Sequence, residues 1–255
     1  MSDPILRIEG VTKRFGGLIA VNNVSFEVPS GQVFALIGPN GAGKTTLFNC
    51  ITGLFRPTSG SVIFKGQPIS GLKQHEVARL GIARTFQNIR LFDFMTAQDN
   101  VRLGQHVRMT SKLWDSLFKT PRARREEKAV SERAMELLNF VGAGAYADDY
   151  ARNLPYGHQR RLEIARALAT NPKLLLLDEP AAGFNPQEKV DLMRLVEKIL
   201  ELDVTVFLIE HDMRVVMGAS KQIAVLDHGE KIAEGTPEEV RHNPQVIEAY
   251  LGRSA

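Results

Sequence analysis

A glycine-rich segment, residues 37–46, constrains this chain more than any other, because it reads Ile-Gly-Pro-Asn-Gly-Ala-Gly-Lys-Thr-Thr. It follows the apolar run 33–37, which predicts a buried strand, and it opens residues 45–52, which predict a helix. In this context the pattern G-x-x-x-x-G-K-T is typical of a loop whose backbone N–H groups cradle nucleotide phosphates at the positive end of a helix. The predicted phosphate-binding residues are Gly38, Pro39, Asn40, Gly41, Ala42, Gly43, Lys44, Thr45 and Thr46. Lys44 adds a full positive charge, and Thr45 supplies a hydroxyl for Mg²⁺.

The composition fits a globular chain that is long for one ordinary domain, with 255 residues, 44% of them hydrophobic and 24% charged. A net charge of +3 does not indicate a nucleic-acid partner. The single cysteine, Cys50, excludes an internal disulfide, and we expect a buried, inert thiol that fits a reducing cytoplasm. No leader and no apolar run near the roughly 20 residues of a membrane span stand out, so we expect any membrane role to come through a partner.

The order of the predicted elements indicates an α/β fold. Residues 5–9 and 21–28 predict an N-terminal antiparallel β layer, since apolar and polar residues alternate in the second of them. Further along, the patterns predict a helix at 157–170, a strand at 174–177, a helix at 186–202, a strand at 204–209, a hairpin at 223–233 and a helical tail at 237–251. Strands that alternate with helices predict a mostly parallel sheet of the P-loop NTPase (RecA-like) type.

A change of periodicity predicts an inserted subdomain. From about Leu91 to Arg152 the β-branched runs stop and the apolar residues recur with helical spacing. We therefore expect a nucleotide-binding core at residues 4–90 and 153–255, with a helical subdomain at 91–152.

A second motif follows the predicted strand 174–177, where Asp178 and Glu179 come directly after four leucines. Asp178 is placed to hold Mg²⁺, directly or through water, and Glu179 to polarise a water that attacks a γ-phosphate. Ligands bind at the carboxyl ends of parallel strands, and we expect this strand to neighbour the one before the phosphate loop.

Three further stretches carry a resemblance to a known family. Thr85-Phe86-Gln87-Asn88 stands between the predicted core and the helical insert, Ile209-Glu210-His211-Asp212 follows a core strand, and Arg14-Phe15-Gly16-Gly17 precedes the second strand. Together with the phosphate loop and the acidic pair, they resemble the ATP-binding subunits of ABC transporters over essentially the whole chain. The resemblance implies an ATPase that uses ATP and Mg²⁺.

The resemblance also implies roles for these residues. Gln87 would sense Mg²⁺ and the attacking water, His211 would bond the γ-phosphate, and Phe15 would stack on adenine. The implied catalytic residues are Glu179, His211, Gln87 and Lys44, and the implied metal ligands are Thr45, Gln87 and Asp178.

Two stretches depart from the family pattern. The signature loop, usually Leu-Ser-Gly-Gly-Gln, is here Leu154-Pro155-Tyr156-Gly157-His158-Gln159. Pro155 stands where a serine hydroxyl normally donates to the γ-phosphate of the partner's ATP, and Asn185 stands where most members keep an aspartate. Loss of one hydrogen bond to a charged group weakens a site by about 1.5 to 3 kcal/mol.

These departures, with the long insert around residues 114–127, resemble the branched-chain amino-acid uptake subgroup. In that subgroup two different ATP-binding subunits pair beneath two membrane subunits, which a periplasmic binding protein feeds. The resemblance implies the motor of a bacterial importer at the cytoplasmic face of the inner membrane, peripheral through its membrane subunits. We expect a heterodimer in preference to a homodimer.

Other functions stay open on the sequence. Lipopolysaccharide-export ATPases are similar but resemble this chain less in the signature loop, and importers of amides or urea fit because solute contacts lie in other subunits. Soluble ABC ATPases of DNA repair or translation typically carry a second cassette or a long coiled coil, and a GTP switch protein carries Asn-Lys-x-Asp. The basic run 119–128 predicts a loop entering a solvated helix, or else a contact with lipid headgroups or a partner.

Overall fold

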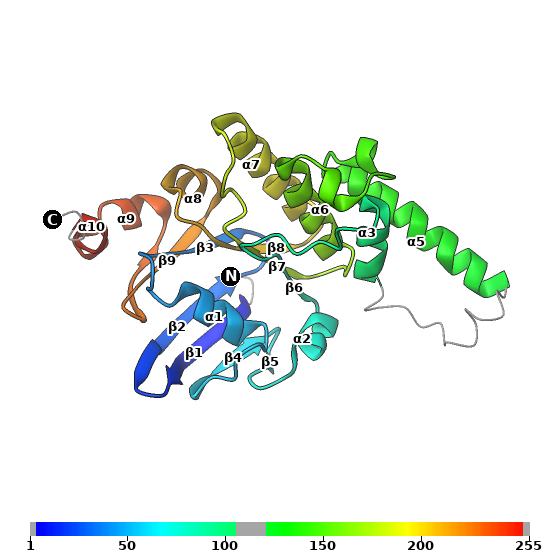
Figure 1. The fold of residues 1–255 in the computed structure, drawn as a ribbon. Coiled ribbons are helices and arrows are strands. Elements are labelled where there is room, and N and C mark those ends of the chain that lie inside the picture. Colours follow the sequence, from blue (N-terminus) through cyan, green and yellow to red (C-terminus); the bar gives the residue numbers. More distant parts are fainter. Residues whose placement is uncertain (1–3, 106–120, 252–255) are drawn as a thin grey trace. The chain divides into compact units, whose positions relative to one another are not determined.

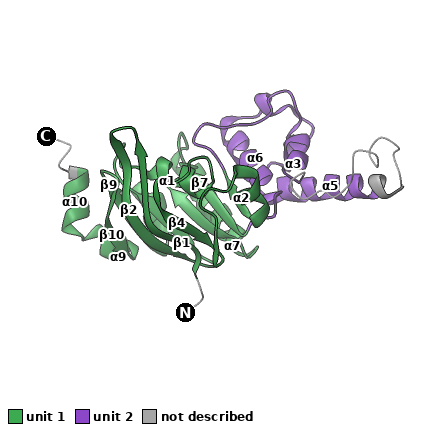
Figure 2. Cartoon of the chain, turned by 90° about the horizontal axis from the view of Figure 1, so that it is seen from below, with its two compact units in different colours: residues 1–84, 173–255 green, residues 85–172 purple. Residues whose placement is uncertain are grey.

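The computed structural model describes residues 4–105 and 121–251. The chain divides into two compact units, residues 1–84 with 173–255 and residues 85–172 (Figure 2). Each unit is described by itself below.

The first unit contains two sheets (Figure 1). Its elements are β1 (Pro4–Phe15), β2 (Leu18–Pro29), β3 (Val33–Ile37), α1 (Lys44–Ile51), β4 (Ser59–Phe64), β5 (Gln67–Pro68), α2 (Gln74–Leu80), β6 (Ile82–Arg84), β7 (Leu174–Asp178), α7 (Pro186–Leu200), β8 (Thr205–Ile209), α8 (Met213–Ala219), β9 (Gln222–Asp227), β10 (Glu230–Gly235), α9 (Pro237–Arg241) and α10 (Pro244–Leu251).

The larger sheet has the strand order β10-β9-β3-β8-β7-β6. All of its neighbouring strands pair in parallel except β9 and β10, which form the predicted antiparallel hairpin. The α/β class with a mostly parallel sheet is therefore confirmed. The expectation that β3 and β7 are neighbours was wrong, because β8 lies between them and pairs with both. The loop after β8, which carries His211, consequently emerges between the loops after β3 and β7.

The smaller sheet is the predicted antiparallel layer, with the order β2-β1-β4-β5. Aromatic side chains join it to the larger sheet. Phe26 of β2 stacks on Phe34 of β3 with ring centroids 5.3 Å apart, and Phe207 of β8 meets Phe34 edge-on at 5.3 Å. Phe48 of α1 lies 4.8 Å from Phe207. Because burial of each ring stabilises the fold by roughly 1.5 to 3 kcal/mol, this cluster holds β3 and α1, the two flanks of the phosphate loop, in one core.

The second unit is helical. It contains α3 (Ala97–Gln105), α5 (Pro121–Phe140), α6 (Tyr156–Leu168) and two 3₁₀ turns, η2 (Gly144–Tyr146) and η3 (Ala151–Asn153). Helix α6, which we expected in the core that resumes at residue 153, makes its contacts with α3 and α5. The domain boundaries proposed from sequence remain a prediction.

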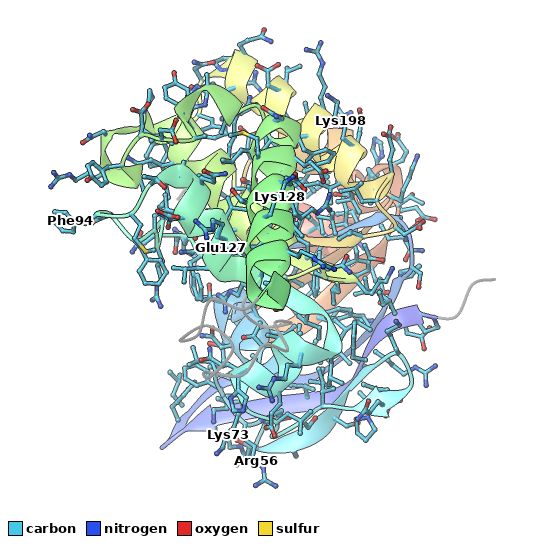
Figure 3. All side chains as sticks on the ribbon, turned by 90° about the vertical axis from the view of Figure 1, so that its right-hand side faces the viewer. Arg56, Lys73, Phe94, Glu127, Lys128 and Lys198 are labelled. Atoms are coloured by element: carbon cyan, nitrogen blue, oxygen red, sulfur yellow. The ribbon has the colours of Figure 1, made fainter. Side chains whose placement is uncertain are left out.

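Part of the insert that the sequence singled out lies outside the described residues, namely 106–120, which include Trp114. The described part of the basic run belongs to α5, where Glu127 and Lys128 are exposed (Figure 3). The described part of the run is therefore helical, with Arg125, Glu127 and Lys128 exposed.

Cys50 is buried on α1, as predicted. Burial raises the pKa of its thiol to about 11, against an opposing effect of Lys13. About one thiol in a thousand is then ionised at pH 8.

We expect a thiol reagent such as Ellman's to leave Cys50 of the native chain unmodified at pH 8 and to label one equivalent once guanidinium unfolds it. Absorbance measures the labelling. Fast stoichiometric labelling of the native chain would contradict this.

Candidate nucleotide-binding site

The phosphate loop joins β3 to α1 and passes close to two neighbouring strands. Gly38 has φ 149°, and a Cβ there would lie 2.1 Å from the Leu226 carbonyl oxygen of β9. Gly43 has φ 98°, and a Cβ there would lie 2.4 Å from the Ala20 carbonyl oxygen of β2. Only glycine fits these two positions, because any side chain would collide with backbone. The glycines therefore fix the path of the loop.

The start of α1 is arranged for an anion. Its N-cap is Gly43, and no side chain caps it. The amides of a first helical turn then face outward with the positive end of the helix dipole. Lys44 is 7% exposed, and its ammonium donates to the carbonyl oxygens of Gly38 at 2.6 Å and Pro39 at 2.9 Å. The predicted cation therefore lies inside the loop, folded over its backbone.

Asp178 is held at the end of β7 by an arginine that sequence reasoning missed. Its Oδ2 accepts a hydrogen bond from Arg84 Nη2 at 2.6 Å, and Arg84 Nη1 donates to Asn49 Oδ1 at 2.6 Å. Both partners of the ion pair are nearly fully buried. Because Asn49 lies on α1, this chain of bonds ties the carboxylate of β7 to the phosphate-loop helix.

Glu179 and His211 meet at the same edge of the sheet. Glu179 Oε2 lies 3.6 Å from His211 Nδ1, with the glutamate side chain 18% exposed and the imidazole 58% exposed. Glu179 has φ 47°, a left-handed conformation that is rare for a residue with a side chain. Its amide donates to the Ile209 carbonyl oxygen at 2.9 Å, which holds it in place. Backbone strain of this kind clusters at functional sites.

Phe15 ends β1 and is 41% exposed. Its ring meets Phe55 edge-on at 5.2 Å, and the Lys13 ammonium lies 5.0 Å from its centroid. The ring is therefore available to a ligand at the surface of the first unit, and its contact with adenine remains a prediction.

In the second unit, the residues around Gln87 are fastened to α6. Arg160 donates to the carbonyl oxygens of Phe86 at 2.6 Å and Gln87 at 2.8 Å. Glu163 Oε1 accepts from the amides of Phe86 at 3.2 Å and Arg90 at 3.4 Å, and Oε2 pairs with Arg160 at 3.1 Å. Burial raises the pKa of Glu163, while Arg160 and the two amides oppose that shift. Hydrogen bonds from Arg160 and Glu163 thus connect the segment 86–90 to α6, the helix that follows the signature loop.

The predicted signature residues all lie at the start of α6. They are Leu154, Pro155, Tyr156, Gly157, His158 and Gln159. Pro155 is the N-cap residue, and no side chain caps the helix. Gln159 Nε2 instead donates to the Leu154 carbonyl oxygen at 2.8 Å. The loop therefore presents a helix N-terminus without the hydroxyl that serine would supply.

Asn185, the second departure from the family pattern, has a structural role. Its Oδ1 accepts from the Glu188 amide at 3.0 Å, and Glu188 Oε2 accepts from the Asn185 amide at 2.8 Å. This capping box opens α7. Asparagine caps a helix about as well as aspartate does, so the exchange leaves this part of the site intact.

The donor set suits Mg²⁺ bound together with a phosphate. Among residues 4–105 and 121–251, no three acidic, histidine or cysteine side chains gather to hold a metal by themselves. Mg²⁺ usually takes one or two protein oxygens and completes its shell with water and substrate phosphate. Thr45 on the first turn of α1 and Asp178 at the end of β7 supply such oxygens.

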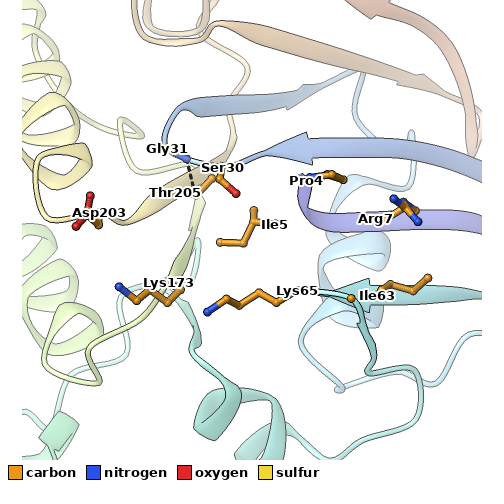
Figure 4. Close-up of a pocket in the computed structure, with 11 residues that line it drawn as sticks. Pro4, Ile5, Arg7, Ser30, Gly31, Ile63, Lys65, Lys173, Asp203 and Thr205 are labelled. Atoms are coloured by element: carbon orange, nitrogen blue, oxygen red, sulfur yellow. Dashed lines mark hydrogen bonds between the residues drawn. The ribbon is translucent and has the colours of Figure 1, made fainter. Parts of the chain in front are cut away.

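A cavity of about 810 Å³ lies at the other end of the parallel strands (Figure 4). Gly31 precedes β3, Lys173 precedes β7 and Thr205 opens β8, and all three line it. It therefore opens at the amino ends of these strands, whereas the phosphate loop, Asp178 and His211 lie at their carboxyl ends.

Comparison with known families agrees with this geometry. The profile described as "ABC transporter" matches residues 21–182, and the one described as "Branched-chain amino acid ATP-binding cassette transporter" matches residues 230–255. The chain belongs to the ABC transporter family.

Individual relatives of this ABC cassette cover all or most of its length. It is 51% identical to the high-affinity branched-chain amino acid transport ATP-binding protein BraF of Pseudomonas aeruginosa, over 100% of both chains. It resembles the solved ADP conformation of an ABC transporter cassette with a TM-score of 0.86 and 35% identity, over 98% of this chain and 100% of that one. A dimeric post-hydrolysis cassette bound to ADP and Pi gives a TM-score of 0.78 and 27% identity, over 91% and 98%.

The structure of the cassette brings together part of the predicted site. The phosphate loop, Asp178, Glu179 and His211 share one edge of the larger sheet, while Gln87 and the signature loop belong to the second unit. Arg84 was missed because a single arginine at a strand end carries no pattern. Arg160 and Glu163 had a readable signal, opposite charges three residues apart on a predicted helix.

The cap of α7 makes a testable prediction. We expect Asn185→Ala to lower the free energy of unfolding by about 1 kcal/mol, because the Glu188 amide loses its acceptor. Asn185→Asp keeps that acceptor, and we expect it to stay within a few tenths of a kcal/mol of the parent. Urea unfolding of the three proteins measures both effects, and equal stability of the alanine variant would contradict the cap.

Proposed function

We propose that this chain is the ATP-hydrolysing motor subunit of a bacterial importer of branched-chain amino acids. The observation that carries the proposal is the joint presence of the phosphate loop, Asp178, Glu179 and His211 at one sheet edge in a cassette that is 51% identical to a branched-chain amino acid transport subunit. The match of residues 230–255 to the branched-chain family supports the choice of solute.

The residues of the site have distinct tasks in this proposal. Lys44 neutralises charge that develops on the phosphate oxygens, and Glu179 accepts a hydrogen bond from the attacking water. His211 bonds the γ-phosphate within reach of Glu179, and Phe15 stacks on adenine. Bound Mg²⁺, held through Thr45 and Asp178, would add charge neutralisation at the phosphates, and the role of Gln87 stays what the family resemblance implies.

Each ATP lies between two subunits in this proposal, with the phosphate loop of one facing the signature loop of the other. The dimeric cassette among the similar structures supports such pairing. A different partner subunit fits better than a second copy, because Pro155 supplies neither a hydroxyl nor an N–H to the γ-phosphate. The partner's own signature loop would then complete the stronger site.

An exposed aromatic surface on the second unit suits a membrane subunit. Phe92, Phe94 and Tyr150 are 53%, 75% and 49% exposed, and Phe94 projects from the unit (Figure 3). Arg152 lies 4.6 Å from the Phe94 ring centroid. No helix in the described ranges 4–105 and 121–251 is long and apolar enough to cross a membrane. We place the chain at the cytoplasmic face of the inner membrane, docked through this surface.

The function is tested on the transporter assembled with its membrane subunits. We expect a binding protein loaded with leucine, isoleucine or valine to stimulate ATP hydrolysis severalfold. Glu179→Gln should lower the stimulated rate about 10²- to 10⁴-fold while ATP binding and the closed dimer persist, because the water loses its base. Phosphate release and nucleotide binding are the two measurements.

Exposed Glu197 on α7 offers the matched control, and Glu197→Gln should behave as the parent. Stimulation by amides or urea alone would reassign the solute. If no loaded binding protein stimulates ATP hydrolysis, and hydrolysis is instead coupled to export of a lipid-linked saccharide, the lipopolysaccharide-export alternative would be favoured. A normal rate in Glu179→Gln would overturn the role of that carboxylate.

Asymmetry of the two ATP sites is tested by single-site turnover. With the catalytic glutamate of one subunit disabled at a time, we expect the site completed by Pro155 to be about 10-fold or more slower, in line with one missing charged hydrogen bond. Pro155→Ser should raise its rate, because the hydroxyl can cap α6 and reach phosphate. Equal rates in the parent would refute the asymmetry.

A further inference from the structure

Glu210 is a fully buried carboxylate that the proposed chemistry leaves without a task. It follows β8 directly and is 0% exposed. Its Oε1 accepts from the Ala181 amide at 2.8 Å. Its Oε2 accepts from the amides of His211 at 3.0 Å and Asp212 at 3.2 Å. Backbone donors thus satisfy both oxygens of a charge that would be costly to bury alone.

The donors come from two different loops. Ala181 belongs to the loop after β7, two residues beyond Glu179, and its carbonyl oxygen accepts from the Phe184 amide at 3.1 Å. His211 and Asp212 belong to the loop after β8. The Glu210 side chain therefore connects the loop that carries Glu179, the predicted base, to the loop that carries His211, the predicted γ-phosphate ligand.

A second bond near the surface joins the loop after β8 to α7, the helix that follows the loop after β7. Asp212 Oδ2 pairs with Lys189 Nζ of α7 at 2.6 Å. The hydrogen bond from Lys189 is the largest of the effects that lower the pKa of Asp212. These groups are 21% and 30% exposed, so solvent weakens the pair. The buried link through Glu210 is therefore the stronger constraint on the relative position of the loops.

We propose that Glu210 is a positioning residue that fastens the His211 loop to the loop after Glu179, so that the two side chains meet the γ-phosphate in one fixed arrangement. The inference rests on the proposed roles of Glu179 and His211. His211 Nδ1 lies 3.6 Å from Glu179 Oε2 and 3.9 Å from Glu210 Oε2, so a shift of either loop would change the first distance. Small displacements of reacting groups cost large factors in rate.

The requirement is specific to a carboxylate of this length. A glutamine accepts through one oxygen only, and its NH₂ group would face an N–H donor on the other side. Glu210→Gln can therefore hold one loop but not both. Aspartate keeps both acceptors but is one methylene shorter, so it cannot reach the two loops at once.

The test is a double-mutant cycle in the assembled transporter with Glu210→Gln, His211→Ala and the double variant. We expect Glu210→Gln to lower kcat about 10- to 100-fold with KM for ATP within about threefold. If Glu210 acts through His211, the double variant should be no slower than His211→Ala within about twofold. Glu197→Gln is the matched control and should leave all parameters unchanged.

Amide hydrogen exchange of the full chain supplies the second readout. We expect exchange to rise at least about tenfold in Glu210→Gln at the amides of one of the two loops, either Ala181 or His211 and Asp212, because glutamine leaves that loop without its acceptor. If that variant fails to fold, Glu210→Asp replaces it in both measurements with the same expectations.

Each outcome decides a different claim. The positioning role would be overturned if the double variant lost kcat by the product of the two single-variant factors, or if kcat were unchanged in Glu210→Gln. An unchanged kcat in His211→Ala would instead refute the proposed function of His211, and exchange at the three amides would still report whether Glu210 joins the loops.

Discussion

Close approach of backbone to backbone at the phosphate loop is the constraint on which the site depends. The loop enters beside β9 at Gly38 and leaves beside β2 at Gly43, at separations that leave no room for a side chain. The hairpin after β9 adds a bond from the Gly229 amide to the Ala42 carbonyl oxygen at 3.1 Å. Both sheets of the first unit therefore shape the loop, which explains why the antiparallel layer belongs to the nucleotide-binding core.

Buried charges then set the positions of the side chains around that loop. Arg84 joins Asp178 to α1, and Glu210 joins the loops after β7 and β8. Neither the Arg84–Asp178 ion pair nor the buried Glu210 carboxylate adds much net stability over apolar packing of the same volume, since burying charge is costly. What these groups supply is a defined geometry, because each has hydrogen-bond partners in only one arrangement of the strands.

The local elements were readable from sequence because their signals are local. Alternation in β2, apolar runs in β3, β7 and β8 and the glycine pattern after Ile37 each depend on residues within one stretch. The order of strands was not readable, and β8 proved to separate β3 from β7. Arg84 and the role of Glu210 were missed for a similar reason, since the partners of Arg84 and the Ala181 partner of Glu210 lie far away along the chain and no spacing records them. The tail predicted as one helix is two, α9 and α10, separated at Pro244.

The ion pair of Arg160 and Glu163 gives the second unit a mechanical property. Both residues lie on one turn of α6, with side chains 0% and 1% exposed. They make hydrogen bonds to the backbone of residues 86–90. Pro155 is the N-cap of the same helix, so these bonds connect the backbone of residues 86–90 to the helix that begins at the signature loop. A displacement of residues 86–90 that keeps these buried bonds would therefore carry the start of α6, and the signature loop with it.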